Sequence, residues 1–193
     1  SCTITASVAG GYKAECKVTV PKPTYIRTKL YMMNTNDWGT TVSEESADIT
    51  TADQEYTMTL KVTDTQLQNI GSLYLKDIQA TEPEDSPISY ATLKVKSIKV
   101  NGKEYSMNNS VFTYNSSLKS TTGKANNVFD FAFVNIWAIT YIDDVTTESK
   151  KAYFNGVSYQ GTNTISMTFE VSDVKANGTE TPSAAPSSTP KVT

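Results

Sequence analysis

The chain has 193 residues, a net charge of −3 and a pI of about 5.0, and this length accommodates one domain with a buried core. It contains no histidine, which excludes Ser-His-Asp and Cys-His catalysis, the common zinc sites and a histidine pH switch. The net charge is acidic and the sequence has no cluster of basic residues, which argues against binding of duplex nucleic acid. No apolar run reaches the roughly 20 residues that a membrane-spanning helix needs.

Hydroxyl and aromatic side chains are abundant. Ser and Thr make up a quarter of the chain, and 11 Tyr accompany 2 Trp. β-Branched and aromatic residues favour strands, and hydroxyls suit the solvent faces of sheets. This composition is typical of a secreted all-β domain, so we expect an extracellular or cell-surface location. No signal-peptide pattern begins at Ser1, which implies that any export signal has been removed.

Residues 1–20 predict a β-hairpin, because two alternating runs flank an Ala-Gly-Gly turn. The register that this turn implies places Cys16 opposite Ile4 and Cys2 opposite Val18. The two sulfurs are then diagonal neighbours, which is a poor geometry for a disulfide. A disulfide and two unpaired thiols both remain open.

Composition divides the rest of the chain. Pro21 and Pro23 follow the hairpin, and residues 24–174 carry the alternating apolar pattern of a folded domain. Residues 175–193 are rich in Pro, Ser and Thr without apolar periodicity, which is typical of a linker. We therefore expect one module of a larger extracellular protein, monomeric and flanked by neighbouring modules in the same chain.

The main domain has a period of two almost throughout. A phase slip near Ser97 predicts a β-bulge, and Asn101-Gly102 predicts a two-residue type I′ turn. Residues 63–70 are a weak helix candidate. About seven to ten strands with polar loops predict an all-β fold, an antiparallel, jelly-roll-like β-sandwich. The expected strands include residues 24–33, 55–62, 72–78, 91–100, 128–141 and 164–171.

A sugar-binding loop is predicted after the first of these strands. Polysaccharides are bound by aromatic rings that stack on pyranose faces, with amides and carboxylates beside them for the hydroxyls. Asn36 and Asp37 directly precede Trp38 in a polar loop. The loop therefore offers a ring, an amide and a carboxylate in one place, although a packed Trp38 is an equally open interpretation.

A second group of candidates lies on strands. Asn135 and Trp137 share one face late in the 128–141 strand, but Trp137 also shares its phase with core-like phenylalanines, which favours burial. Tyr25 and Tyr31 share the outward face of the 24–33 strand. Tyrosine is common on β-protein surfaces, so each of these two is a weak signal alone.

Nothing in the sequence indicates catalysis. The 20 carboxylates lie mostly in loops or alternate with Thr and Lys, as on a solvated acidic surface. We find no nucleophile motif, phosphate loop or metal-ligand triad, and we expect a non-catalytic protein without a cofactor. Asp143 and Asp144 are a candidate pair for a structural Ca²⁺ site, because calcium takes several oxygen ligands.

Two segments resemble known families. The hairpin TITASVAGGY with CKVTV resembles the last two strands of bacterial Ig-like modules of the second family. The ordered motifs LYMMNTNDWGTT, EYTMTLKV, SLYLKDIQA, ATLKVKSIKVNGKEY, FAFVNIWA and TISMTFEVSDV resemble β-sandwich carbohydrate-binding modules of secreted gut and rumen Gram-positive bacteria. The second resemblance covers about residues 25–174. It implies ligand contacts from the Trp38 loop and from the strand that carries Asn135 and Trp137.

The preferred function is therefore binding of a polysaccharide, either a starch-type α-glucan or a plant β-glycan such as xylan. The module would keep its parent protein on its substrate, with neighbouring modules raising the affinity. The alternative is a structural Ig-like spacer or adhesin domain. A third interpretation is a protein-binding domain, which a contiguous apolar patch would favour. Exposure of Trp38 and Trp137 discriminates among them.

Overall fold

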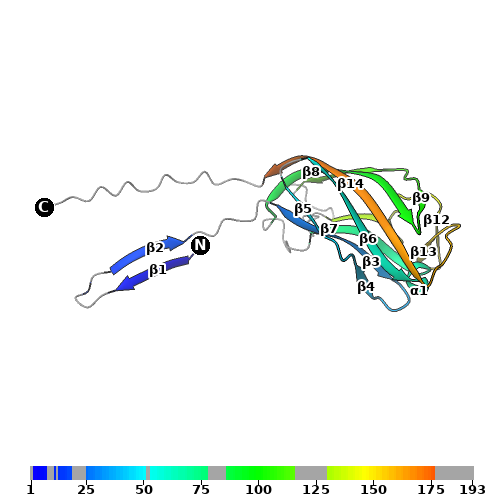
Figure 1. Cartoon of the computed structure of the whole chain (residues 1–193), viewed down its shortest axis with the longest axis horizontal. Helices are drawn as coiled ribbons and strands as arrows, with labels where there is room; N and C mark the ends of the chain where they lie inside the picture. Colours follow the sequence, from blue (N-terminus) through cyan, green and yellow to red (C-terminus); the bar gives the residue numbers. More distant parts are fainter. Residues whose placement is uncertain are drawn as a thin grey trace.

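The computed structural model describes residues 2–7, 11, 13–18, 25–50, 53–77, 86–115 and 130–176. Two antiparallel sheets pack face to face around one hydrophobic core, which confirms the predicted antiparallel β-sandwich (Figure 1). The core is built from the inward faces of both sheets, as expected for alternating strands. Its largest fully buried side chains include Phe133, Phe154 and Phe169.

The N-terminal hairpin forms its own two-stranded sheet from β1 (Cys2–Ser7) and β2 (Lys13–Val18). The predicted register is confirmed, with Cys16 opposite Ile4 and Cys2 opposite Val18. Cys16 carries a free, exposed thiol.

The five-stranded sheet has the strand order β10-β8-β14-β6, and β9 also pairs with β8. Figure 1 shows β14 running along the length of the sandwich. β14 pairs with β6 on one edge and with β8 on the other. The strands are β6 (Gln54–Thr63), β8 (Ile88–Val100), β9 (Lys103–Tyr105), β10 (Val111–Asn115) and β14 (Thr162–Ala176).

The seven-stranded sheet has the order β12-β13-β7-β3-β4, with β11 also paired to β7 and β5 to β3. Because β3 and β11 both pair with β7, segments distant in sequence meet at the ends of this strand. The strands are β3 (Ile26–Asn34), β4 (Thr40–Val42), β5 (Ala47–Ile49), β7 (Ile70–Asp77), β11 (Asp130–Asn135), β12 (Val145–Glu148) and β13 (Lys151–Phe154).

Local signals in β8 and its turn are confirmed. The register against β14 shifts at the point where Phe169 pairs with Val95 and Thr168 with Ser97, so Lys96 is the extra residue of a bulge. Asn101 and Gly102 have φ of 50° and 83°, as a type I′ turn requires.

The strand predicted for residues 128–141 is wrong in length. β11 ends at Asn135, and the chain then turns back so that Val134 bridges Thr140. The Asn135 side chain accepts a hydrogen bond from the backbone N–H of Trp137 at 3.0 Å. This local bond offers the backbone an alternative to the sheet ladder, which explains why the strand stops.

The described residues contain one short helix, α1 (Asp64–Leu67), within the predicted candidate 63–70. Thr63 and Gln66 form a reciprocal capping box at its start. Leu67 is fully buried and fixes the turn to the core. In this part of the chain, no helix is long and apolar enough to cross a membrane.

A buried polar hub joins this helix to the five-stranded sheet. Asn163 is fully buried; its Nδ2 donates to Oδ1 of Asp64 at 2.7 Å, and its Oδ1 accepts from Nδ2 of Asn101 at 2.7 Å. The backbone N–H of Gln160 donates to the same Oδ1 at 3.1 Å. One amide therefore holds the start of α1, the type I′ turn and the entry to β14 together.

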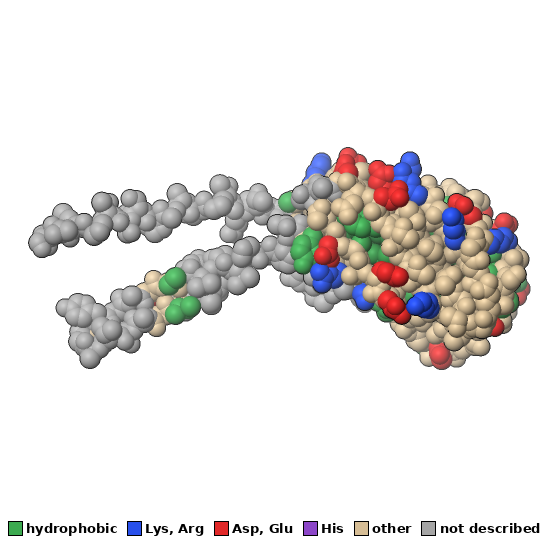
Figure 2. Space-filling model, viewed as in Figure 1, with side chains coloured by type: hydrophobic (Ala, Val, Ile, Leu, Met, Phe, Trp, Pro, Cys, Tyr) green, Lys and Arg blue, Asp and Glu red, His purple; other side chains and the backbone are tan. Residues whose placement is uncertain are grey.

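Charged side chains of both signs are interspersed on the face shown in Figure 2, with largely uncharged surface between them. Two exposed ion pairs join strands: Arg27 with Asp48 at 2.7 Å, and Lys96 with Glu170. Each pair lowers the pKa of its carboxyl through the side-chain hydrogen bond from its cation. Burial raises the pKa of several phenols, namely Tyr31, Tyr56, Tyr105, Tyr114 and Tyr159.

These shifts predict a stability plateau. Carboxyls with a lowered folded-state pKa add stability above about pH 4, which is lost as the pH falls through that pKa. Phenols with a raised pKa add stability below about pH 10, which is lost as the pH rises. Thermal unfolding followed by circular dichroism should therefore give a melting temperature that is flat between about pH 5 and 9. A step near pH 6.5, the ordinary histidine pKa, would contradict this expectation.

Candidate functional site

Two tryptophans that are far apart in sequence stack at one end of the sandwich. The rings of Trp38 and Trp137 lie nearly parallel, with centroids 5.9 Å apart and an interplanar angle of 18°. Their relative exposures are 64% and 53%, although aromatic side chains of this size are usually buried. The expectation that Trp137 belongs to the core is therefore wrong. We call the Trp38–Trp137 pair the aromatic platform.

The loop between β3 and β4 presents Trp38. The backbone N–H and the Nδ2 of Asn34 both donate to the carbonyl of Gly39, at 3.0 and 3.1 Å, which closes the loop. Inside it, the Gly39 N–H donates to Oδ1 of Asp37 at 2.8 Å. Trp38 has φ of 59°, in the left-handed region that non-glycine residues seldom adopt. The loop is thus held in a strained conformation that turns the indole outward.

Asn34 and Thr35 fix this loop to the sandwich. The Thr35 N–H donates to the carbonyl of Asn69, just after α1, at 2.8 Å. Asn34 is fully buried, and its Oδ1 has no hydrogen-bond partner within the described residues. An unpaired buried oxygen costs stability, so the loop closure made by the same amide must offset it.

A tight turn after β11 presents Trp137. The Asn135 N–H donates to the carbonyl of Ile139 at 3.1 Å, and the Ile136 N–H donates to the carbonyl of Gly71 at 3.1 Å. Together with the bond from the Trp137 N–H to the Asn135 side chain, these contacts fix both ends of the turn. Trp137 therefore stands on a rigid support.

Gly71 makes room for this ring. A Cβ at position 71 would lie 2.9 Å from Cγ2 of Thr35, 3.2 Å from Cε of Met33 and 3.3 Å from Cη2 of Trp137. Real Cβ atoms seldom approach side chains this closely, so any larger residue would push at least one of these neighbours away. The absence of a side chain at Gly71 therefore allows the Trp137 indole to pack over the start of β7.

The outward face of β3, β7 and β11 continues from the aromatic platform. On it, Tyr31 and Tyr74 pair across the strands and stack, with centroids 5.3 Å apart and planes at 15°. A hollow of about 240 Å³ lies beside them. Its lining consists of Ser72, Tyr74, Lys76, Ala132 and Asn135. We call it the β7 hollow; Asn135 borders it and also supports Trp137.

The predicted site residues divide into three groups. Trp38, Trp137 and Asn135 come together at the aromatic platform. Asn36 and Asp37 are exposed in the Trp38 loop, where Asp37 shapes the turn through its bond to Gly39. The remaining two residues lie on the β3 side: Tyr31 stacks on Tyr74, which lines the β7 hollow, and Tyr25 lies before the start of the strand.

Tyr25 is separated from this site. It precedes β3 at Ile26, whereas the Trp38 loop follows the far end of the strand at Asn34. Nine residues of extended chain span about 30 Å. The guanidinium of Arg27 lies over the Tyr25 ring, 5.6 Å from its centroid, which is a surface cation–π contact. The structure therefore does not bring Tyr25 to the platform.

Sequence reasoning missed Gly71, Ser72 and the role of Tyr74. The burial pattern of β7 places Tyr74 and Lys76 on its outward face, which agrees with the alternation of apolar and polar residues along this strand. Their proximity to Trp137 depends on β11 pairing with the same strand, in a register where Asn135 lies opposite Ser72. Spacing along the chain gives no signal for such a pairing.

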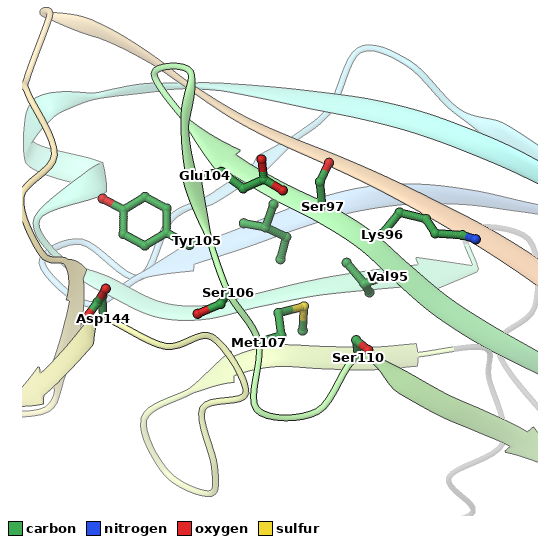
Figure 3. Close-up of a pocket in the computed structure, with 10 residues that line it drawn as sticks. Val95, Lys96, Ser97, Glu104, Tyr105, Ser106, Met107, Ser110 and Asp144 are labelled. Carbon is green, nitrogen blue, oxygen red and sulfur yellow. The ribbon is translucent and has the colours of Figure 1, made fainter.

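A larger hollow of about 530 Å³ opens along β8, between β9 and β10 (Figure 3). Its carboxylates, Glu104 and Asp144, lie apart, and Lys96 extends away from both in Figure 3. The Ser106 hydroxyl donates to Oδ2 of Asp143 at 2.8 Å. The described residues contain no group of three or more acidic, cysteine or histidine side chains placed to hold a metal ion.

Comparison with protein-family models, with curated proteins and with solved structures finds no significant match to this chain. The interpretation of the site therefore depends on its geometry and on its residue types.

Proposed function

We propose that this protein binds a polysaccharide without acting on it, and that the aromatic platform is its main contact. The observation that carries the proposal is the exposed, stacked pair of Trp38 and Trp137. Exposing two indoles to water is unfavourable, so a protein keeps them there where a ligand covers them. Tryptophan stacks well on the apolar face of a pyranose, because its ring is large, rigid and flat.

The surroundings of the platform suit a hydroxyl-rich ligand. Asn36 is exposed in the Trp38 loop, and Asn135 lies beneath Trp137. Amide groups donate and accept, as sugar hydroxyls require. The resemblance of the ordered strand motifs to carbohydrate-binding modules of secreted bacterial proteins supports the same proposal. In that setting the module would hold its parent protein on an insoluble or polymeric substrate.

A spacer or adhesin domain is the second candidate. Rigid β-sandwiches separate other domains well, and the hairpin of β1 and β2 has the motif of an Ig-like module. However, a spacer has no use for two exposed tryptophans at one end of the sandwich. We therefore place polysaccharide binding first.

Native affinity electrophoresis of the full chain tests the proposal. The gels contain starch, pullulan, xylan, mixed-linkage glucan or mannan, and a double variant, Trp38→Ala with Trp137→Ala, runs beside the wild type. We expect one class of glycan to retard the wild type and not the double variant, while the circular dichroism spectra of the two remain alike. Equal mobility of both proteins in every gel would refute the proposal and favour the spacer.

A further inference from the structure

We propose that the β7 hollow is a second subsite, which binds the sugars next to the one stacked on the aromatic platform. The protein then recognises a run of linked units along a glycan chain rather than a single terminal sugar. This inference rests on the proposed function and deepens it.

Continuity with the platform is the first argument. Trp137 packs over Gly71, and the hollow begins at the next residue of β7, Ser72. Asn135 belongs to both places: its Oδ1 accepts the N–H of Trp137 at 3.0 Å, and its side chain lines the hollow. From Gly71 to Lys76, the five steps between six strand residues cover about 16 Å, or about three pyranose units.

Unused polar groups are the second argument. Among the residues whose side chains the structure describes, no protein group pairs with Oγ of Ser72 or with Nδ2 of Asn135. Ser72 is only 9% exposed, so its hydroxyl is available mainly through the hollow that it lines. A nearly buried hydroxyl, an amide and an ammonium group together offer the donors and acceptors that sugar hydroxyls need.

The walls of the hollow are the third argument. Tyr74 is fixed on one side by its stack with Tyr31. Opposite it in register lies Ala132, whose small side chain leaves the space open. A bulge follows Ala132 in β11, and such irregularities often reshape a strand beside a binding site. A larger residue at position 132 would fill the hollow and remove none of its polar groups.

The test measures how affinity depends on ligand length. Disaccharides to hexasaccharides of the malto, cello, xylo and manno series are titrated into the full chain, with binding followed by tryptophan fluorescence and calorimetry. For the series that binds, the affinity should rise with length until about three or four units are present. Ala132→Leu should weaken the hexasaccharide by about tenfold and the disaccharide by less than about twofold.

Two control variants separate the hollow from general effects. Thr113→Leu places the same leucine side chain at an exposed position of β10 in the other sheet, and Lys99→Ala matches Lys76→Ala in charge. We expect both controls to bind like the wild type, and Lys76→Ala to weaken only the longer ligands, by about threefold to tenfold.

Each contrary result has a distinct meaning. If every length binds equally, or if Ala132→Leu leaves the length dependence unchanged, the hollow is no subsite, although the platform still binds sugar. If the wild type binds no oligosaccharide of any series and no glycan retards it, the proposed function falls together with this inference.

Discussion

Replacing Trp137 by alanine should weaken glycan binding by about thirtyfold to a hundredfold, and replacing Trp38 should weaken it by about fivefold to tenfold. Both indoles are exposed, but their supports differ. Trp137 lies on Gly71 and on a turn fixed by backbone bonds to Gly71 and Ile139. Trp38 itself has a left-handed backbone conformation in an exposed loop, and its ring is supported by stacking on Trp137. Loss of Trp137 therefore also removes the support of Trp38, whereas loss of Trp38 leaves Trp137 in place.

The affinity for a retarding glycan, measured from mobility against glycan concentration, checks this order. Tyr25→Ala is the matched control, because it removes an aromatic ring at the other end of β3 and should change the affinity by less than about twofold. Since Trp137 is 53% exposed, its loss should lower the free energy of unfolding by no more than about 1 kcal/mol. Full binding by Trp137→Ala would show that the platform is not the contact.

Replacing Asn163 by alanine should lower the free energy of unfolding by about 2–4 kcal/mol. The side chain is fully buried and bonds Asp64, Asn101 and the N–H of Gln160. Its removal takes the acceptor from that N–H and one of two donors from Oδ1 of Asp64, which keeps its bond from the Gly161 N–H, and it opens a small cavity. An unsatisfied buried polar group costs more than the bond it has lost.

Urea unfolding followed by circular dichroism measures this loss as a lower midpoint at an unchanged slope. Asn36→Ala serves as the control, because Asn36 is exposed in the Trp38 loop and should cost less than about 0.5 kcal/mol. If Asn163→Ala lowered the free energy of unfolding as little as Asn36→Ala does, the Asn163 hub would contribute little to stability.

Much of the sandwich follows from local patterns. In β3, Ile26, Leu30 and Met32 point inward and Tyr31 outward, as the alternation predicts. The bulge at Lys96 follows from a break in the same alternation, and the Asn101-Gly102 turn from the left-handed preference of these two residues. Each of these features depends on neighbours within a few positions, so the sequence alone determines them.

The aromatic platform could be predicted only in part. The sequence indicates both tryptophans as candidates, Trp38 from its polar loop and Trp137 beside Asn135, but it places Trp137 in a strand that continues to residue 141, which favours burial. That assignment counted the period through a register shift between Ala132 and Val134, beyond which the phase no longer holds. The meeting of the two rings depends on β3 and β11 both pairing with β7. Such non-local pairing leaves no trace in residue spacing.

The length and pairing of β14 have a mechanical consequence. Its start at Thr162 lies beside α1, near the end of the sandwich that carries the platform, and its last residue, Ala176, pairs with Ile88 at the other end. A load between a bound chain and Ala176 would therefore run along the strands. Because β14 is hydrogen-bonded along both edges, such a pull must shear many bonds at once instead of opening them one after another. The pairing of β14 would therefore make the sandwich resist a pull between a ligand on the aromatic platform and the C-terminal end of this strand.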